Sequence, residues 1–456
     1  MNSSAGQSQS PQTLGIRCGH FISMAAGCAE PETDIYIGVS DGKIAEISPW
    51  SPEKAKIAKE FIDASAHVVI PGLVNTHGHL AMTLFRGLGD DLLFHKWLFE
   101  RILPLEAELV DAEFVRIGTS LAALESIRFG VTAVADMYFF AETAADVIDK
   151  AGMRAMIAQC CASGPLPEDK VLGTDKMKLF EILHEKYKGH ERIVASLGPH
   201  APYTCDDALL REVARVSGRL SAPVQIHLAE TKKEVEDSLK LHGKTSTQRL
   251  FDLGLLGPRT LCAHCVHLNE ADTALMKKTD SKVAYNPDSN MKLGSGIAPI
   301  TRYLKEGLTV GFGSDGAASN NDLSIFGAMD IGTKLQKLAS GDNTAMVASD
   351  ALACATCGGA KALGMQDRIG TLEVGKDADM ILVDFSYPHM QPIYDVRSQL
   401  VYATGGLEVD TTICRGRVLM RKHVFQTLDS QKILAQATAL SSKIRGAAMR
   451  YSAELA

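Results

Sequence analysis

The sequence predicts an α/β protein, a (β/α)8 barrel of the TIM type with a small β-sandwich domain formed by both chain flanks. Between residues 67 and 375, short β-branched runs alternate with longer segments rich in Ala, Leu, Glu and Lys. Strands that alternate with helices favour parallel βαβ units, and eight such units close into a barrel. Shorter alternating runs on either side of this region supply the strands of the second domain.

Eight candidate strands make up the predicted barrel at 67–375. Most of them are followed by a helical pattern, such as those at 111–129 and 206–220. The strands are expected to begin near His67, Val131, Arg154, Arg192, Val224, Thr260, Lys282 and Leu308.

The small β-sandwich domain is predicted from residues 14–66 and 376–424. The first segment has two alternating runs around Ser40-Asp41-Gly42, which is a hairpin turn signal. The second has further short strands and a turn at Arg415-Gly416. We expect the two segments to pair with each other outside the barrel.

The two ends of the chain are predicted to differ. Residues 1–13 are polar and rich in Ser and Gln, which favours a disordered tail without a secretory signal. Residues 425–456 form an amphipathic pattern, and we expect a C-terminal helical segment on the surface.

Composition excludes several classes of protein. The net charge of -7 argues against nonspecific nucleic-acid binding, which requires a basic surface. No apolar run approaches the roughly 18 residues of a membrane span. The 10 cysteines are too sparse for a disulfide scaffold and lie in apolar runs. We therefore expect reduced thiols and a cytoplasmic protein.

The segment PGLVNTHGH (71–79) ends the first predicted barrel strand. Catalytic residues of such barrels gather at the carboxyl ends of the strands. Residues i and i+2 of an extended segment point to the same side, so His77 and His79 can present two imidazoles to one metal. Taken alone, the pair is equally compatible with two structural, hydrogen-bonded histidines.

Three further side chains stand at the ends of other predicted strands: His227, His264 and Asp315. All of them therefore converge on one mouth of the barrel. Imidazoles together with a carboxylate suit Zn or Fe. Such a metal keeps a position open for water and lowers its pKa toward ~7, which supplies a nucleophile at neutral pH.

The same strand ends offer groups for proton transfer. Asp315 is a candidate base, and His264 is a candidate for orienting the attacking oxygen. Glu230 lies three residues beyond His227 and can donate a proton to the substrate and return it to the leaving group. The alternative for Glu230 is a carboxylate that is merely stabilised at a helix N-terminus.

Four segments in order, PGLVNTHGH, IHLAET, AHCVHL and SDGAASNN, resemble the amidohydrolase superfamily. Further segments are similar to its branch of 5-methylthioadenosine/S-adenosylhomocysteine deaminases, namely MTLFRGLGDDL, WLFERILPLE, DMYF, GPHAPY and NPDSNMKLGSGIAPI. The resemblance extends from about residue 65 to residue 385. It implies metal-dependent hydrolytic deamination of an adenine nucleoside (5-methylthioadenosine, adenosine or S-adenosylhomocysteine) at C6, which gives the inosine-type product and ammonia.

The resemblance also implies roles for individual residues. Glu230 matches the proton shuttle and also contacts substrate, as does Asp315, while His264 matches the residue that orients hydroxide. Glu106 matches the carboxylate that binds the ribose hydroxyls, and His200 matches a contact to the purine ring. The metal ligands are matched by His77, His79, His227 and Asp315.

Both substrate contacts have a structural alternative. Glu106 could be an exposed carboxylate near a helix start, and His200 could be a core histidine. Two acceptor oxygens nevertheless suit a vicinal diol by geometry.

Two departures bear on the cofactor and the substrate. Many related sites bridge two metals with a modified Lys on strand four, but residues 192–198 contain no Lys. We therefore expect one divalent metal per chain, with Zn²⁺ as the first candidate and Fe²⁺ as the alternative. Gln159 stands where we expect an Arg in members that accept S-adenosylhomocysteine, which weakens the case for homocysteine recognition.

Two other classes of function stay open. One is another reaction on the same scaffold, such as a triazine chlorohydrolase or a free-base deaminase, and the other is a non-catalytic protein that kept only the fold. Glu106 and Glu230 favour the nucleoside deaminase. The expected partner is a small nucleoside, with neither nucleic acid nor membrane, and a homo-oligomer is left open.

Overall fold

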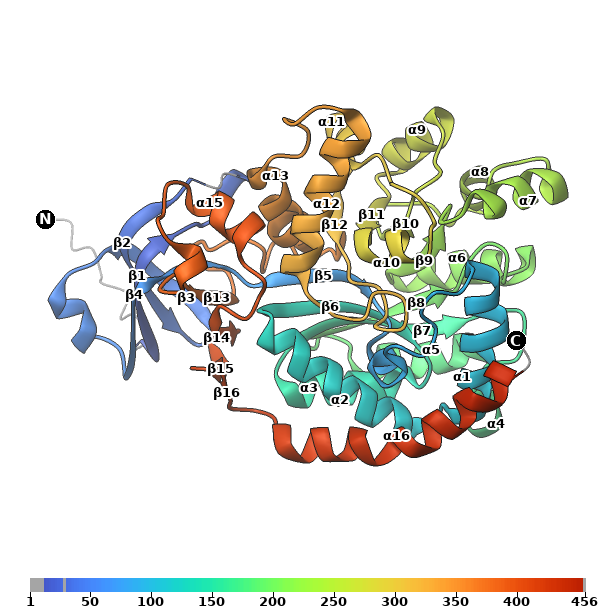
Figure 1. Ribbon diagram of the computed structural model, residues 1–456, viewed down its shortest axis with the longest axis horizontal. Coiled ribbons are helices and arrows are strands. Elements are labelled where there is room, and N and C mark those ends of the chain that lie inside the picture. The colour runs from blue at the N-terminus through green and yellow to red at the C-terminus, as the bar shows by residue number, and fades with distance from the viewer. Residues whose placement is uncertain (1–11, 28–29, 454–456) are drawn as a thin grey trace, which may run out of the picture.

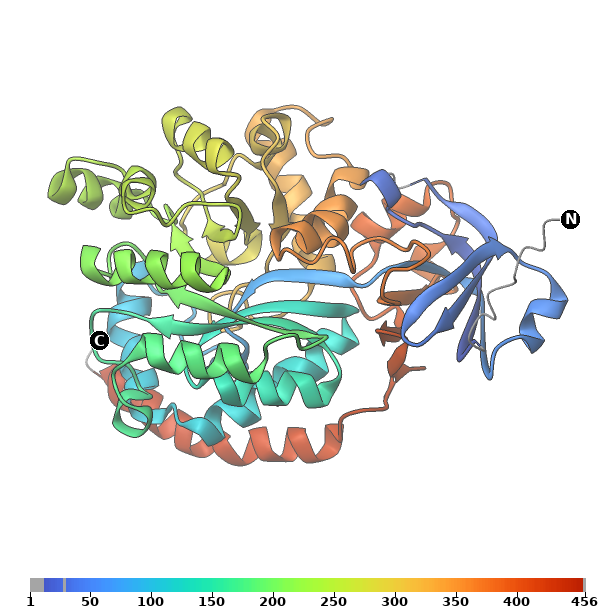
Figure 2. The same cartoon turned by 180° about the vertical axis from the view of Figure 1, so that it is seen from behind.

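Two eight-stranded sheets organise the computed structural model, which describes residues 12–27 and 30–453 (Figures 1 and 2). One sheet is parallel and runs in chain order from β5 to β12. Its two end strands lie against each other, since Thr76 Oγ1 donates to the Phe312 carbonyl oxygen at 2.9 Å. The predicted (β/α)8 barrel is therefore confirmed.

All eight predicted barrel strands are present. Their bounds are β5 Leu73–Gly78, β6 Val131–Tyr138, β7 Arg154–Cys161, β8 Ile193–Pro199, β9 Val224–Leu228, β10 Thr260–His264, β11 Lys282–Tyr285 and β12 Val310–Phe312.

The first barrel strand differs from its prediction. The apolar run that begins at His67 is divided at Gly72, and its first part belongs to β4 (Glu60–Pro71) of the other sheet. Gly72 lies so close to the barrel wall that a Cβ there would stand 2.2 Å from Thr132 Oγ1. One continuous apolar pattern thus serves two sheets, because both of its halves are buried.

Helices cover the outside of the barrel, and the predicted ones at 111–129 and 206–220 are confirmed. Each begins at an Asp whose side chain accepts a backbone N–H, Asp111 from Phe114 and Asp206 from Leu209. The α-helices of this region are α1 Leu103–Leu109, α2 Ala112–Arg128, α3 Ala141–Ala151, α4 Asp169–Leu172, α5 Lys176–Lys186, α6 Asp207–Leu220, α7 Lys232–His242, α8 Ser246–Asp252, α9 Glu270–Thr279, α10 Pro287–Lys292, α11 Ile300–Lys305, α12 Ile325–Ser340, α13 Ala348–Ala353 and α14 Gly359–Ala362.

The second sheet joins the two chain flanks, as predicted. Its order is β16-β15-β14-β13-β4-β1-β2-β3, so that β4 from the first flank pairs with β13 from the second. The strands form one continuous sheet, and an isolated antiparallel β-bridge between Lys43 and Asp377 links the two flanks a second time. Their bounds are β1 Leu14–Phe21, β2 Glu32–Ser40, β3 Lys43–Pro49, β13 Met380–Asp384, β14 Val409–Cys414, β15 Arg417–Arg421 and β16 Val424–Phe425.

The disordered tail predicted at 1–13 falls largely outside the described residues. Its last two residues, however, are part of the small domain. Gln12 is buried and donates from Nε2 to Glu46 Oε2 at 2.9 Å, and the Thr13 N–H donates to the Val39 carbonyl oxygen at 2.7 Å. The boundary of the prediction was therefore wrong at these positions. Their polar side chains are typical of a surface, but the two residues find hydrogen-bond partners on β2 and β3.

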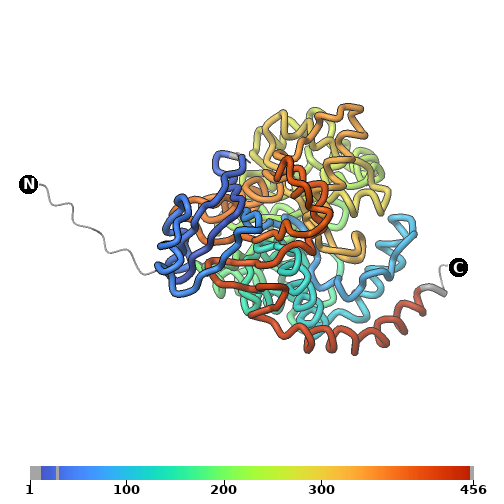
Figure 3. The backbone as a smooth tube through the Cα atoms, turned by 60° about the vertical axis from the view of Figure 1, so that its left-hand side comes forward, coloured from blue at the N-terminus to red at the C-terminus, as the bar shows by residue number. Residues whose placement is uncertain are grey.

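The C-terminal helix α16 (Ser430–Ala453) runs from the small domain along the barrel to the region of α1 (Figures 1 and 3). Arg101 Nη1 donates to the Ala448 carbonyl oxygen at 2.6 Å and ties this helix to the segment before α1. In the part of the chain that the structure describes, no helix is long and apolar enough to cross a bilayer. No cysteine there forms a disulfide.

Candidate active site

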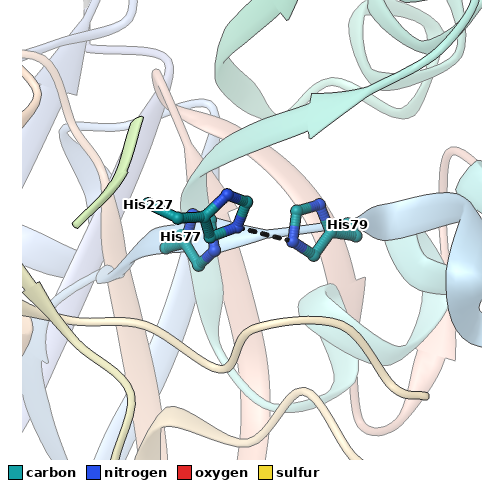
Figure 4. A group of neighbouring side chains, drawn as sticks. All are labelled: His77, His79 and His227. Atoms are coloured by element: carbon teal, nitrogen blue, oxygen red, sulfur yellow. Dashed lines mark hydrogen bonds between the residues drawn. The ribbon is translucent and has the colours of Figure 1, made fainter. Parts of the chain in front are cut away.

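The carboxyl ends of the barrel strands bring the predicted residues together. His77 lies in β5, His79 directly after it, and His227 in β9, and Figure 4 shows the three imidazoles turned toward one another. His79 Nε2 lies 3.3 Å from His227 Nε2. Asp315, after β12, has its Oδ1 3.3 Å from His79 Nε2 and 3.5 Å from His77 Nε2.

Backbone carbonyls fix the orientation of two of these imidazoles. His79 Nδ1 donates to the Met137 carbonyl oxygen, and His227 Nδ1 donates to that of His200, both at 2.6 Å. A neutral ring that donates from Nδ1 keeps its lone pair on Nε2. Both rings therefore turn Nε2 toward the centre of the cluster. In neutral His227 this atom carries a lone pair. Burial acts to lower the pKa of His79, but Asp315 raises it to about 9, so His79 must give up its Nε2 proton when it binds a cation.

The donor set fits a divalent cation. His77 Nε2 is buried and has no hydrogen-bond partner among the described residues. Burial lowers the pKa of His77 to about 4 and that of His227 well below its usual range, so both rings are neutral at pH 7. Burial acts to raise the pKa of Asp315, but the imidazoles of His77 and His79 beside it hold that pKa well below its usual range. Neutral imidazoles and an ionised carboxylate are the ligands that Zn²⁺ and Fe²⁺ prefer.

His264 differs from the other histidines of the cluster in its hydrogen bonds. Its Nδ1 lies 2.8 Å from Asn290 Nδ2 and accepts from that amide, which places the ring proton on Nε2. Burial lowers the pKa of His264 to about 4, so the ring is neutral. It therefore offers an N–H to the cluster and not a lone pair. This matches a residue that orients an oxygen.

Glu230 is a buried carboxyl beside His264, with Oε2 3.8 Å from His264 Nε2. Its Oε1 accepts from Ser295 Oγ at 3.1 Å. Burial, together with the charge of Asp315, raises the pKa of Glu230 to about 8. At neutral pH the group therefore holds a proton that it can give away, which is the property of a general acid.

A cavity of about 310 Å³ opens onto the cluster. Its polar lining includes Glu106, His200, Glu230 and Asp315. The apolar wall comes from Met82, Phe94, Trp97, Leu98, Ile102, Leu103, Met137, Phe139, Pro165, Leu166 and Leu293, among others. Within the described lining there is no Lys or Arg side chain.

Glu106 and His200 both face this cavity. Glu106, from α1, is 4% exposed, which excludes the exposed helix-start carboxylate. Its Oε1 has no hydrogen-bond partner among the described residues, and burial raises its pKa to about 7 although the Tyr138 hydroxyl nearby lowers it. His200 follows β8 and lies with its ring centroid 4.8 Å from that of His227.

Gln159 does not face the cavity. Its Nε2 donates to Glu168 Oε1 at 2.6 Å, and the same oxygen accepts from Lys176 Nζ at 3.1 Å. Arg154 begins β7 and is buried against Asp377 and Asp379 at the side of the small domain. Neither residue is therefore placed to contact a ligand at the strand ends.

Sequence reasoning missed the polar residues that hold the site in place. Asp315 Oδ2 accepts from Ser289 Oγ at 2.6 Å and from Ser319 Oγ at 3.1 Å. These serines, like Asn290 and Ser295, lie in the quoted segments NPDSNMKLGSGIAPI and SDGAASNN. The segments indicated a site, but small polar side chains show no role until their partners are known.

Comparison with known proteins agrees with this geometry. The model of the amidohydrolase family matches residues 68–419. A 5-methylthioadenosine/S-adenosylhomocysteine deaminase from Syntrophobacter fumaroxidans is 41% identical over 410 residues, which cover 90% of this chain and 93% of that protein. A 5′-deoxyadenosine deaminase from Methanosarcina mazei is 42% identical over 401 residues, which cover 88% and 91%.

Solved structures are similar over nearly the whole chain. An adenosine deaminase from Xanthomonas campestris with bound zinc has a TM-score of 0.92 at 34% identity, covering 96% of this chain and 99% of that one. An atrazine chlorohydrolase from Arthrobacter aurescens has a TM-score of 0.86 at 22% identity, covering 94% and 100%. At that identity the second comparison shows a shared fold alone.

Proposed function

The chain belongs to the amidohydrolase family, and from this premise we propose that it catalyses metal-dependent hydrolytic deamination of an adenine nucleoside. The products are the inosine-type nucleoside and ammonia. The relatives named as deaminases of adenine nucleosides support this proposal. The observation that carries it is the buried carboxyl of Glu106, whose Oε1 has no hydrogen-bond partner among the described residues, in the same cavity as Glu230. A diol-binding group has no use in a free-base deaminase or a triazine chlorohydrolase.

We assign His77, His79, His227 and Asp315 as ligands of one divalent metal, with zinc as the first candidate. When bound, the metal lowers the pKa of water and so supplies a nucleophile at neutral pH. The absence of Lys from β8 supports a single metal, since no residue there can form a carbamate bridge.

The remaining groups move protons. Glu230 gives its proton to a ring nitrogen next to C6 as water adds to that carbon. Asp315 takes the proton of the adding water, and the Nε2–H of His264 stabilises the charge that develops on the oxygen. Asp315 passes its proton to the amino group, the C6–N bond breaks, and ammonia leaves. As the C6 carbonyl forms, the proton of the C6 hydroxyl goes to Glu230 and restores its acid form.

The proposal is tested by measuring ammonia release from adenosine, 5-methylthioadenosine, 5′-deoxyadenosine, S-adenosylhomocysteine and free adenine. We expect turnover of at least one nucleoside and little turnover of adenine. Turnover of adenine alone, or of none of these compounds by metal-loaded protein, would refute it.

Replacing Glu106 with Ala should selectively weaken the use of substrates that carry ribose hydroxyls. A hydrogen bond to a charged group contributes about 1.5–3 kcal/mol, so kcat/KM for adenosine should fall by ~10–100-fold. The change should be small for 2′,3′-dideoxyadenosine, which lacks the diol. Glu100→Ala, at an exposed carboxylate nearby, is the matched control. Equal losses on both substrates would contradict the assignment.

The cavity should prefer an uncharged 5′ substituent. Its described lining has no Lys or Arg to pair with the carboxylate of a homocysteine group, and a buried unpaired charge is costly. We expect kcat/KM for 5-methylthioadenosine or adenosine to exceed that for S-adenosylhomocysteine by about tenfold or more. Side-by-side kinetics measure this ratio, and a preference for S-adenosylhomocysteine would show the argument to be wrong.

A further inference from the structure

A second buried carboxylate, Glu234, contacts the turn that carries Glu230. Glu234 is 6% exposed and lies in the first turn of α7. Its Oε1 accepts the backbone N–H of Ala229 at 2.9 Å, and its Oε2 accepts that of Glu230 at 3.0 Å. The two carboxylate oxygens of Glu234 thus accept hydrogen bonds from consecutive peptide N–H groups of one turn.

This arrangement departs from the ordinary cap of a helix. Thr231 caps α7, and its side chain accepts the N–H of Glu234 at 3.1 Å. In a capping box the Glu at this position reaches back to the N–H of the cap residue itself. Here it reaches past Thr231 to the two residues before it. Its hydrogen bonds therefore hold the turn and contribute little to closing the helix.

The turn needs such support because its backbone is unfavourable. Ala229 has a φ of +49°, in the left-handed region that residues with a Cβ rarely adopt. The N–H of His267 donates to the Ala229 carbonyl oxygen at 2.9 Å and holds the turn from its other side. Beyond the turn, the Glu230 side chain accepts from Ser295 and faces the cavity. A relaxed Ala229 would move Glu230 away from this position.

We propose that Glu234 is a positioning residue, which acts on the reaction by fixing the turn at Ala229 and Glu230 so that the Glu230 carboxyl faces the substrate. The inference rests on the proposed function for the role of Glu230. It concerns the peptide groups of the turn and requires no contact between Glu234 and substrate.

The test is Glu234→Gln, which keeps size and replaces one acceptor oxygen by an NH2 group that faces a backbone N–H. A misplacement of about 1 Å costs up to ~100-fold, so we expect kcat to fall by ~10–100-fold. KM should change by less than about threefold, because substrate binding is retained. Metal content should equal that of the wild type. Glu236→Gln, two residues along the same helix at an exposed carboxylate, is the control and should behave as wild type.

Two further variants separate positioning from a loss of stability. In a Glu230→Gln background, adding Glu234→Gln should cost nothing more, because the group that Glu234 positions is already lost. Ala229→Gly should restore part of the kcat of Glu234→Gln, because glycine adopts a positive φ without strain. If Glu234→Gln alone does not fold, the same kinetic and structural measurements are made on the double variant with Ala229→Gly.

Several results would overturn the inference. One is an unchanged kcat in Glu234→Gln. Another is a further fall in kcat when Glu234→Gln is added to Glu230→Gln. A crystal structure of Glu234→Gln in which the 3.1 Å contact between Glu230 and Ser295 persists would do the same. If wild-type protein deaminates no adenine nucleoside, the proposed function fails, and the crystal structure alone decides the positioning of Glu230.

Discussion

Glu230→Gln is expected to lower kcat by ~10²–10⁴-fold, the usual contribution of a positioned proton donor. The amide has the shape of the acid but no proton to give. In the wild type, burial and the charge of Asp315 raise the pKa of Glu230 to about 8, so the acid form prevails at neutral pH. The ligand cluster does not include Glu230, and metal content should therefore stay the same.

Steady-state kinetics on the best nucleoside, together with metal analysis of the same sample, measure this effect. Gln can still accept from Ser295 Oγ, so the cavity should keep its shape and KM should change little. Near-wild-type turnover in the variant would exclude Glu230 as the proton shuttle. Loss of metal along with activity would instead place Glu230 in the metal site.

The convergence of the site was predictable because a parallel barrel gathers its strand ends. His77, His227, His264 and Asp315 each follow from one local rule, a polar residue at the end of an apolar run. Because the strands are parallel, their carboxyl ends lie at the same end of the barrel, and these residues are therefore neighbours. The pairing of the two flanks in a separate sheet followed from the same kind of local pattern.

Other features depend on contacts that no local pattern encodes. The break at Gly72 lies inside a continuous apolar run, and the proximity of Thr132 requires a glycine at this position. The burial of Glu106 depends on how α1 packs over the cavity. The difference between His264 and the two lone-pair donors, His79 and His227, depends on whether Nδ1 meets an amide or a carbonyl. Each requires knowledge of a partner distant in the sequence.

Removing the metal is expected to abolish activity and leave the fold in place. The nitrogens of His77, His79 and His227 lie within 4.8 Å of one another, and Asp315 lies within the same distance of His77. The barrel core is built from apolar side chains elsewhere. Far-UV circular dichroism should therefore be unchanged after chelation. The melting temperature should fall, since a ligand that binds only the folded state stabilises it.

Active protein should contain one equivalent of metal per chain. Re-addition of Zn²⁺, with Fe²⁺ tested in parallel, should restore turnover and identify the metal. Two equivalents in active protein, or full activity without metal, would contradict this assignment, because the first requires a bridging ligand and the second a nucleophile from another source.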